Sequence, residues 1–249
     1  MKPTLWIVAV ALFSVACSQS SPIQPAATKS PAATASSAIA GTTSTQQGAP
    51  ARAGNINLIP EYGLQNGSHL TPSDPPNTPI YRVAKGDGSP LVPARPILAP
   101  DGHQVTLGEY VHVTGSAAVK CIDEGSHSVV HVSGLIANGV YTIWYVVPNQ
   151  PGFPMHIPFL RVGPAGADDG SQNRFDASAS GEGELSVITP AGSFVFPAGP
   201  GPFPSCAFTY SEFSLVGAYH IDKRTWGPVP GNPADPGSVI DQFEFAFHK

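Results

Sequence analysis

Two histidines four residues apart, His127 and His131, are the first residues whose type and spacing suggest metal binding. On an α-helix, positions i and i+4 lie one turn apart on the same face and can hold one ion. Here valines surround both histidines and predict a strand, in which positions i and i+4 lie roughly 13 Å apart. Each nitrogen ligand must lie about 2 Å from a metal ion. We therefore expect two separate histidines that share no metal.

Two other histidines carry the remaining metal hypothesis. His156 directly follows Met155, and His220 lies in a predicted strand. A blue-copper site needs cysteine, histidine and a weak methionine ligand near one another, and neither Cys121 nor Cys206 is followed closely by both. A copper or zinc site built from His156, His220 and a third group from another strand is an alternative that the sequence leaves open.

The segment 220–233 offers a different kind of site. Asp222, Arg224 and Trp226 stand at alternate positions in a loop rich in proline and glycine. An indole ring can stack on a sugar or clamp a peptide, and the charged groups can provide hydrogen bonds. The segment therefore predicts a binding loop. The simpler alternative is that Trp226 only covers the rim of the fold.

The N-terminus predicts export. Residues 1–16 combine a positive Lys2 with the short apolar stretch LWIVAVALF, as a signal peptide does. That stretch is shorter than the ~20 residues that a membrane-spanning helix needs. The following SVAC (14–17) resembles the lipobox of bacterial lipoproteins, with Ser14 where the family prefers leucine. The resemblance implies lipidation of Cys17, and Ser18 is compatible with outer-membrane sorting. An ordinary cleavage site is the alternative.

The other two cysteines, Cys121 and Cys206, form an even pair in an exported protein, which predicts a disulfide. Closing a loop of roughly 85 residues would stabilise the fold by roughly 4–5 kcal/mol in the chain-entropy model. Two thiols in a metal or redox site usually stand closer together in the sequence.

Composition indicates the fold class and limits the partners. Only 12% of the 249 residues are charged, against a typical quarter, whereas Gly (26) and Pro (28) are abundant. No long stretch shows the apolar period of a helix, so we expect an all-β fold with many turns. The formal net charge is −5 and no Lys/Arg cluster is present. We expect no nucleic-acid partner, because such a partner needs a basic surface.

The chain divides into four predicted regions: the signal peptide 1–16, a tether 17–54, an arm 55–100 and a domain 101–249. The tether is almost entirely Ser, Thr, Ala, Pro, Gln and Gly, and it has too little apolar surface to fold. The arm contains apolar residues, but its recurring prolines exclude a central strand. We predict an extended arm packed on the domain, with a short edge strand over 79–84.

Alternating residues predict the strands of the domain. Segments 211–222 and 239–247 alternate apolar and polar residues, which indicates one buried face. Segment 140–147 is apolar on both faces and predicts a central strand. Further strands are expected at 105–113, 117–121, 128–132, 158–162, 174–180 and 184–188. Many short strands without intervening helices predict a single, Greek-key-like β-sandwich.

One stretch makes the sandwich more specific. GLIANGVYTI (134–143) resembles the tyrosine corner of immunoglobulin-like and fibronectin type III domains. Leu135 and Tyr141 have the six-residue spacing of that corner, and Asn138-Gly139 supplies the turn. The resemblance implies that the Tyr141 hydroxyl bonds back to nearby backbone. It implies no activity.

Together these features predict a lipid-anchored protein of the cell envelope, on the periplasmic or surface side of the outer membrane, or otherwise a secreted protein. Its domain is expected to be a non-catalytic binding or structural module with a protein or glycan partner and no cofactor. A periplasmic copper- or zinc-binding protein and a carbohydrate-binding module are the alternatives. No Gly-x-Ser-x-Gly motif is present, and nothing in the sequence indicates an enzyme.

Overall fold

The computed structural model describes residues 45–47, 64–65, 68–70, 73–84, 90–148, 159–192, 206–207, 210, 212–235 and 237–248. All of them belong to one compact unit, Thr42–Lys249. The predicted signal peptide, Cys17, His156 and most of the tether lie outside these residues. Within the described part, no helix is long and apolar enough to cross a membrane.

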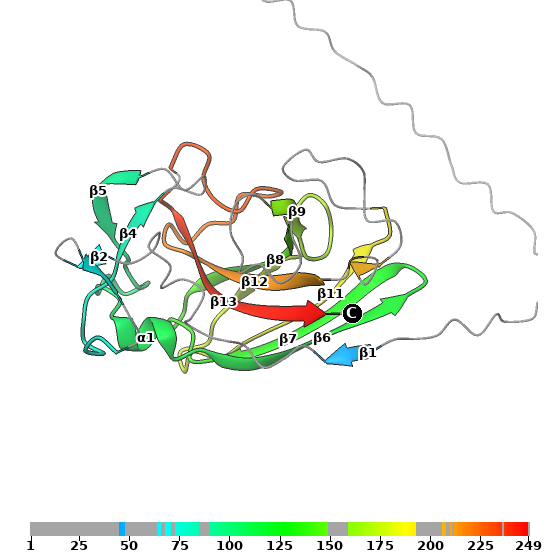
Figure 1. Cartoon of the computed structure of the whole chain (residues 1–249), viewed down its shortest axis with the longest axis horizontal. Coiled ribbons are helices and arrows are strands. Elements are labelled where there is room, and N and C mark those ends of the chain that lie inside the picture. The colour runs from blue at the N-terminus through cyan, green and yellow to red at the C-terminus, as the bar shows by residue number, and fades with distance from the viewer. Residues whose placement is uncertain are drawn as a thin grey trace, which may run out of the picture. The chain divides into compact units, whose positions relative to one another are not determined.

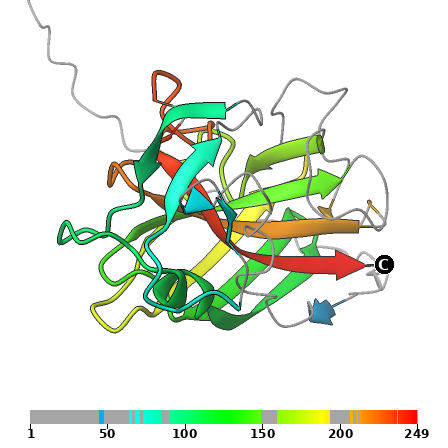
Figure 2. The ribbon, with the colours of Figure 1, turned by 60° about the vertical axis from the view of Figure 1, so that its left-hand side comes forward.

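Two antiparallel sheets account for most of the described chain (Figures 1 and 2). The first sheet contains, in spatial order, β1 (Thr45–Gln47), β6 (Thr114–Ile122), β7 (Gly125–Ser133) and β11 (Gly183–Pro190). The second contains β10 (Arg174–Asp176), β8 (Val140–Pro148), β12 (Glu212–His220) and β13 (Val239–His248), and β9 (Phe159–Pro164) also pairs with β8. The predicted all-β sandwich is confirmed.

Two small hairpins come from the predicted arm. The strands β2 (Leu64–Gln65) and β3 (Ser68–His69) form one, and β4 (Tyr81–Ala84) and β5 (Pro90–Pro96) form the other. The strand predicted over 79–84 therefore starts at Tyr81 and has a partner, β5, that the prolines concealed. Leu70, Ile80, Ile97 and Ala99 belong to the main core, so the described arm residues contribute to it directly.

The strand predicted over 105–113 is wrong, because the helix α1 (Leu107–Val111) occupies most of it. Thr106 is the N-cap: its Oγ1 accepts a hydrogen bond from the Glu109 backbone N–H, and the Glu109 carboxylate accepts one from the Thr106 N–H. This reciprocal capping box starts a helix. The apolar alternation of the segment resembles a strand, but the Thr-x-x-Glu spacing was the better signal.

The strand β8 is central, as predicted. It pairs with β12 along one edge and with β9 and β10 along the other. Its side chains on one face, such as Tyr141 and Tyr145, enter the core between the sheets. Those on the other face, Trp144 and Val146, form a smaller cluster with Val162, Val216 and Ala218. Burial of both faces explains why this segment lacks alternating polar residues.

Aromatic side chains fill the space between the two sheets. The rings of Phe213 and Phe247 stack with centroids 4.8 Å apart. The ring of Phe243 lies over Gly217, where an added Cβ would come within 2.0 Å of it, so β12 needs a glycine at this position. The predicted strands 211–222 and 239–247 thus correspond to β12 and β13, with the alternating phenylalanines facing inward.

The predicted disulfide is present. Cys121 in β6 is bonded to Cys206, with 85 residues of sequence separation and a Cα–Cα distance of 5.6 Å. Next to it, the Ser126 hydroxyl accepts a hydrogen bond of 2.7 Å from the Ala207 backbone N–H. The segment that precedes β12 is therefore fixed to the first sheet by one covalent bond and one hydrogen bond.

Tyr141 joins distant parts of the chain through its buried hydroxyl. The hydroxyl accepts a hydrogen bond of 2.9 Å from the Ile136 backbone N–H, which is the local contact expected of a tyrosine corner. It also donates one of 2.6 Å to the Gln242 side chain in β13. The turn before β8 is thus held against the last strand of the same sheet.

We expect Tyr141→Phe to lower the free energy of unfolding by about 2–6 kcal/mol, the sum of two lost hydrogen bonds. The change leaves a buried N–H and a buried amide oxygen without partners, and each such loss costs about 1–3 kcal/mol. Urea denaturation measures the effect. As a control, Tyr219→Phe removes a single bond, from the hydroxyl to the Leu98 carbonyl, and should cost about half as much. Equal losses in the two variants would contradict the double role of Tyr141.

Candidate functional site

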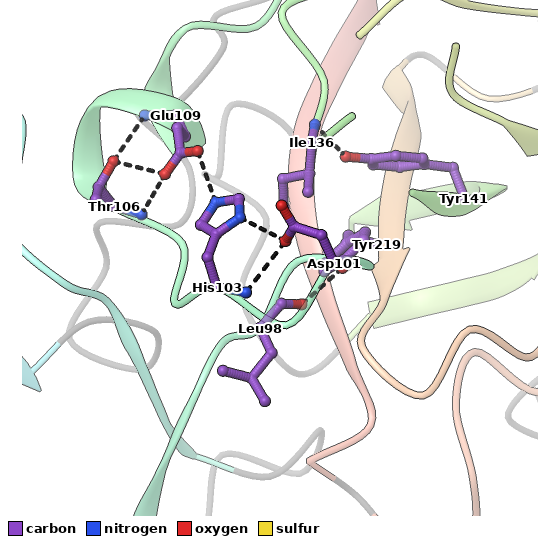
Figure 3. A network of polar contacts seen from close by, with 8 residues as sticks. All are labelled: Leu98, Asp101, His103, Thr106, Glu109, Ile136, Tyr141 and Tyr219. Carbon is purple, nitrogen blue, oxygen red and sulfur yellow. Dashed lines mark hydrogen bonds and ion pairs between the residues drawn. The ribbon is translucent and has the colours of Figure 1, made fainter. Parts of the chain in front are cut away.

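His103 bridges two carboxylates at the surface (Figure 3). Its Nδ1 lies 2.6 Å from Asp101 Oδ1, and its Nε2 lies 2.8 Å from Glu109 Oε1. The turn after β5 positions Asp101 and His103, because the Ala99 N–H bonds to the His103 carbonyl at 2.9 Å. The capping box of α1 orients Glu109 toward the same ring.

The electrostatics of this bridge favour a charged imidazole. Hydrogen bonds to Asp101 and then to Glu109 raise the pKa of His103 above 6.5. Hydrogen bonds from His103 lower the pKa of Asp101. Partial burial raises the pKa of Glu109, but hydrogen bonds from Thr106 and His103 outweigh it and lower the net value. Since both ring nitrogens already have partners, His103 serves to hold α1 to the turn and is poorly suited to act as a general base.

The turn that contains His103 also contacts the end of β12. The Tyr219 hydroxyl donates to the Leu98 carbonyl at 2.7 Å, and the Lys223 ammonium donates to the Pro100 carbonyl at 2.8 Å. Figure 3 shows Tyr219 reaching Leu98 beside the His103 bridge. These contacts hold the turn against the end of β12.

His220, a candidate metal ligand, is fully buried. It lies on the face of the second sheet that points away from the core between the two sheets, as Val216 and Ala218 do. Its Nε2 lies 2.8 Å from Thr142 Oγ1, which also accepts a bond of 2.7 Å from the Trp144 indole N–H. No described group bonds to Nδ1. Burial lowers the pKa of His220 to about 4, against a raising effect of Asp222, and Arg174 lowers it further. The ring is therefore neutral near pH 7.

The predicted binding loop, which contains Asp222, Arg224 and Trp226, is organised around Asp222. Its carboxylate accepts bonds from the Arg224 backbone N–H at 3.1 Å and from the Trp226 indole N–H at 2.8 Å. Trp226 is half-buried, and Arg224 is exposed. The three residues are close together, but the polar atoms of Asp222 and Trp226 are used within the loop. Stacking of a ligand on Trp226 stays a prediction.

The two histidines four residues apart lie on β7, in the predicted strand, and have different neighbours. His127 Nε2 lies 3.0 Å from Ser186 Oγ, and His131 Nδ1 lies 3.6 Å from Glu184 Oε2. Across the described ranges, no three His, Cys, Asp or Glu side chains are placed to hold one metal ion. His156 lies outside those ranges, and a metal site that includes it stays a prediction.

An open groove lies beside His131 on the described surface. Its volume is about 540 Å³, and it lies where β6, β7 and β11 of the first sheet meet the end of β10 and the turn that follows it. Its polar lining consists of Ser116, His131, Ser133, Asp176, Ser178, Glu182 and Glu184. Strand register brings Ser116, His131 and Glu184 side by side across three strands.

The groove is acidic and its acidic groups are exposed. The side chains of Glu184 and Asp176 are 81% and 58% exposed. Arg174 binds both carboxylate oxygens of Asp176 at 3.0 Å and fixes that side chain at the rim. Glu182 lies in a tight turn, and its backbone N–H donates a hydrogen bond of 3.0 Å to Ser178 Oγ. Carboxylates beside serine hydroxyls suit a ligand with ammonium or guanidinium groups.

Sequence reasoning missed both the groove and the His103 bridge. The closely spaced Glu182 and Glu184 in GEGELS, at the start of a predicted strand, are the local signal that pointed toward the groove. Searches against protein-family models, curated proteins and solved structures found no significant match to this chain. The site is therefore argued from its geometry.

We expect His220→Gln to reduce the loss of stability on acidification. Because the native pKa of His220 is about 4 and the unfolded value is near 6.5, the native state binds fewer protons between these values. Falling pH therefore favours unfolding, by up to about 3 kcal/mol. Glutamine places an amide near the position of Nε2 but takes up no proton. Thermal melts from pH 4 to 7 measure the difference from wild type at each pH.

His103→Gln is the control, because the sign of its effect is opposite. A raised pKa gives stability that is present below pH 6.5 and lost as the pH rises through the native value. Burial raises the pKa of Asp241 to about 6, and its contribution to the stability of the protein also falls as the pH rises, so each variant is compared with wild type. Identical pH profiles for His220→Gln and His103→Gln would overturn both assignments.

Proposed function

We propose that this protein is an envelope-anchored, non-catalytic binding module whose ligand site is the acidic groove. The observation that carries the proposal is that three exposed carboxylates, Asp176, Glu182 and Glu184, line one groove. Such a group of carboxylates attracts cationic groups, and the serine hydroxyls beside it add hydrogen-bonding capacity. The partner is a protein segment that presents lysine or arginine side chains.

The sheet beneath the groove supports binding without rearrangement. The residues that alternate with the groove side chains, Val130, Val132 and Leu185, are buried in the core. Gly115 also lines the groove, and a Cβ there would come within 2.2 Å of the His131 carbonyl, so β6 and β7 approach closely at this point. A fixed backbone lowers the entropy that a ligand must overcome on binding.

We expect the double variant Glu182→Gln/Glu184→Gln to bind a lysine-rich decapeptide about tenfold more weakly than wild type. Each exposed ion pair contributes up to about 1 kcal/mol, and two of them change the dissociation constant by about that factor. Fluorescence anisotropy at low salt measures the affinity, and added salt should weaken it further because exposed charges are screened.

The matched control is Asp123→Asn/Glu124→Gln in the exposed turn between β6 and β7. It removes the same formal charge at a position outside the groove lining. Affinity close to that of wild type is expected. An equal loss in both double variants would show that net charge alone attracts the peptide, and it would remove the groove as the binding site.

The anchor is proposed from the sequence. The apolar leader, the SVAC motif and the small-residue tether support attachment of Cys17 to lipid. Stable attachment generally needs two lipid chains or one chain with a second membrane-binding signal. The tether would then hold the binding module away from the membrane surface.

We expect Cys17→Ser to move the protein from the membrane fraction to the soluble fraction, because serine offers no thiol for lipidation. Fractionation of envelopes followed by immunoblotting measures the distribution. Cys206→Ser is the control: it breaks the disulfide but leaves Cys17 in place, and membrane association should persist. Unchanged fractionation of Cys17→Ser would sink the anchor without touching the groove assignment.

A further inference from the structure

A short strand from the predicted tether lies along one edge of the first sheet. In β1, Thr45, Gln46 and Gln47 pair with Lys120, Val119 and Ala118 of β6. On its other edge β6 pairs with β7 over its whole length, from Thr114 to Ile122. Figure 1 shows β1 as a separate short arrow beside β6. The tether thus supplies the outermost strand of this sheet.

We propose that this edge of β6 is a strand-pairing surface and that residues 45–47 of the same chain occupy it as a reversible cover. An unpaired edge exposes a row of N–H and C=O groups that can pair with a second copy of the chain. The cover protects Ala118, Val119 and Lys120, which lie toward the C-terminal end of β6. The proposal is independent of the lipid anchor and of the groove.

The size of β1 makes the cover reversible. Ordering the backbone of one residue costs about 1–2 kcal/mol, whereas a backbone hydrogen bond contributes about 0.5–1.5 kcal/mol net. With three paired residues, gain and cost are of similar size, so docked and released states are both populated. Gly48 and Pro50 follow directly, and proline offers no N–H to extend the ladder.

Chain connectivity favours the segment of the same molecule over that of a second copy. The segment Thr45–Gln47 precedes β2, which starts at Leu64 in the same compact unit. A linker of this length gives an effective concentration in the millimolar range. A second copy competes only when the protein is comparably concentrated or when the cover is released.

A cysteine pair tests which chain occupies the edge. Gln47 and Ala118 are direct register partners, and opposed Cα atoms lie about 4.5–5.5 Å apart, within disulfide reach. In the full chain with Cys17→Ser, we expect Gln47→Cys/Ala118→Cys to form an intramolecular disulfide on mild oxidation, mapped by peptide mass spectrometry. The control Gln47→Cys/Ser116→Cys moves the partner two residues along β6 and should link at least fivefold less.

Each result of the cross-linking experiment decides the question of occupancy. An in-register link within one chain supports the cover. A disulfide-linked dimer through the same two positions would show that a second copy is the occupant and would overturn the proposal. Equal linking in the test pair and the control pair, or no link, would show that the strand does not dock and would overturn it as well.

Proline variants test the protective role. Ladder hydrogen bonds alternate along an antiparallel pair, so either Gln46 or both Thr45 and Gln47 direct their N–H groups at β6. One of the variants Gln46→Pro and Thr45→Pro/Gln47→Pro must therefore remove the donors. We expect that variant to shift from monomer toward dimer in light scattering after size exclusion, while Thr34→Pro in the tether leaves the mass unchanged. Monomeric behaviour of both proline variants at the same concentration would overturn the protective role.

Discussion

A chain of hydrogen bonds that starts at the Tyr141 hydroxyl joins three elements that the sequence keeps far apart. The hydroxyl accepts from the Ile136 N–H and donates to Gln242, whose amide donates to the Tyr110 carbonyl at 3.2 Å. The Tyr110 hydroxyl in turn donates to the Asp241 carbonyl. Unsatisfied groups at this depth are costly, so the corner before β8, the strand β13 and the helix α1 hold one another in place. The position of Glu109 beside His103 depends on the same chain, because Glu109 belongs to α1.

The local alternation of apolar and polar residues predicts much of the sandwich. The same alternation wrongly predicts a strand where α1 lies, which shows the limit of this signal. The strands β8, β12 and β13 lie where the apolar pattern predicts them, because one buried face or two buried faces dictate the side chains. In segment 105–113 the same pattern arises from a helix that buries Leu107 and Tyr110. A helix of five residues presents too little of its period to be recognised, and the Thr106 cap decides the conformation. In such short segments, local hydrogen bonds of the backbone determine the conformation more strongly than the spacing of apolar residues does.

The candidate sites also differ in how far the sequence predicts them. The loop with Asp222, Arg224 and Trp226 could be predicted as a unit because its contacts span only a few residues. The groove could not, since it takes residues from the four strands β6, β7, β10 and β11 and from the turn between β10 and β11. Which residue stands beside His131 depends on strand register, and a shift of one residue would turn the groove side chains toward the core. Register is fixed by the whole core, so a single segment of sequence does not contain it.

The alternation of a strand also separates the core residues from the groove-lining residues along β7. Val130 and Val132 enter the core, whereas His131 between them faces the groove and is 60% exposed. In contrast, His103 directs both ring nitrogens, and His220 directs its Nε2, at structural partners, which fixes elements but leaves less for a ligand. A change in the outward side chains of β7 and β11 can therefore alter the charge and polarity of the groove while the inward side chains keep the sheet intact. This independence makes an exposed sheet face a suitable position for a binding site on a fold whose stability lies between its sheets.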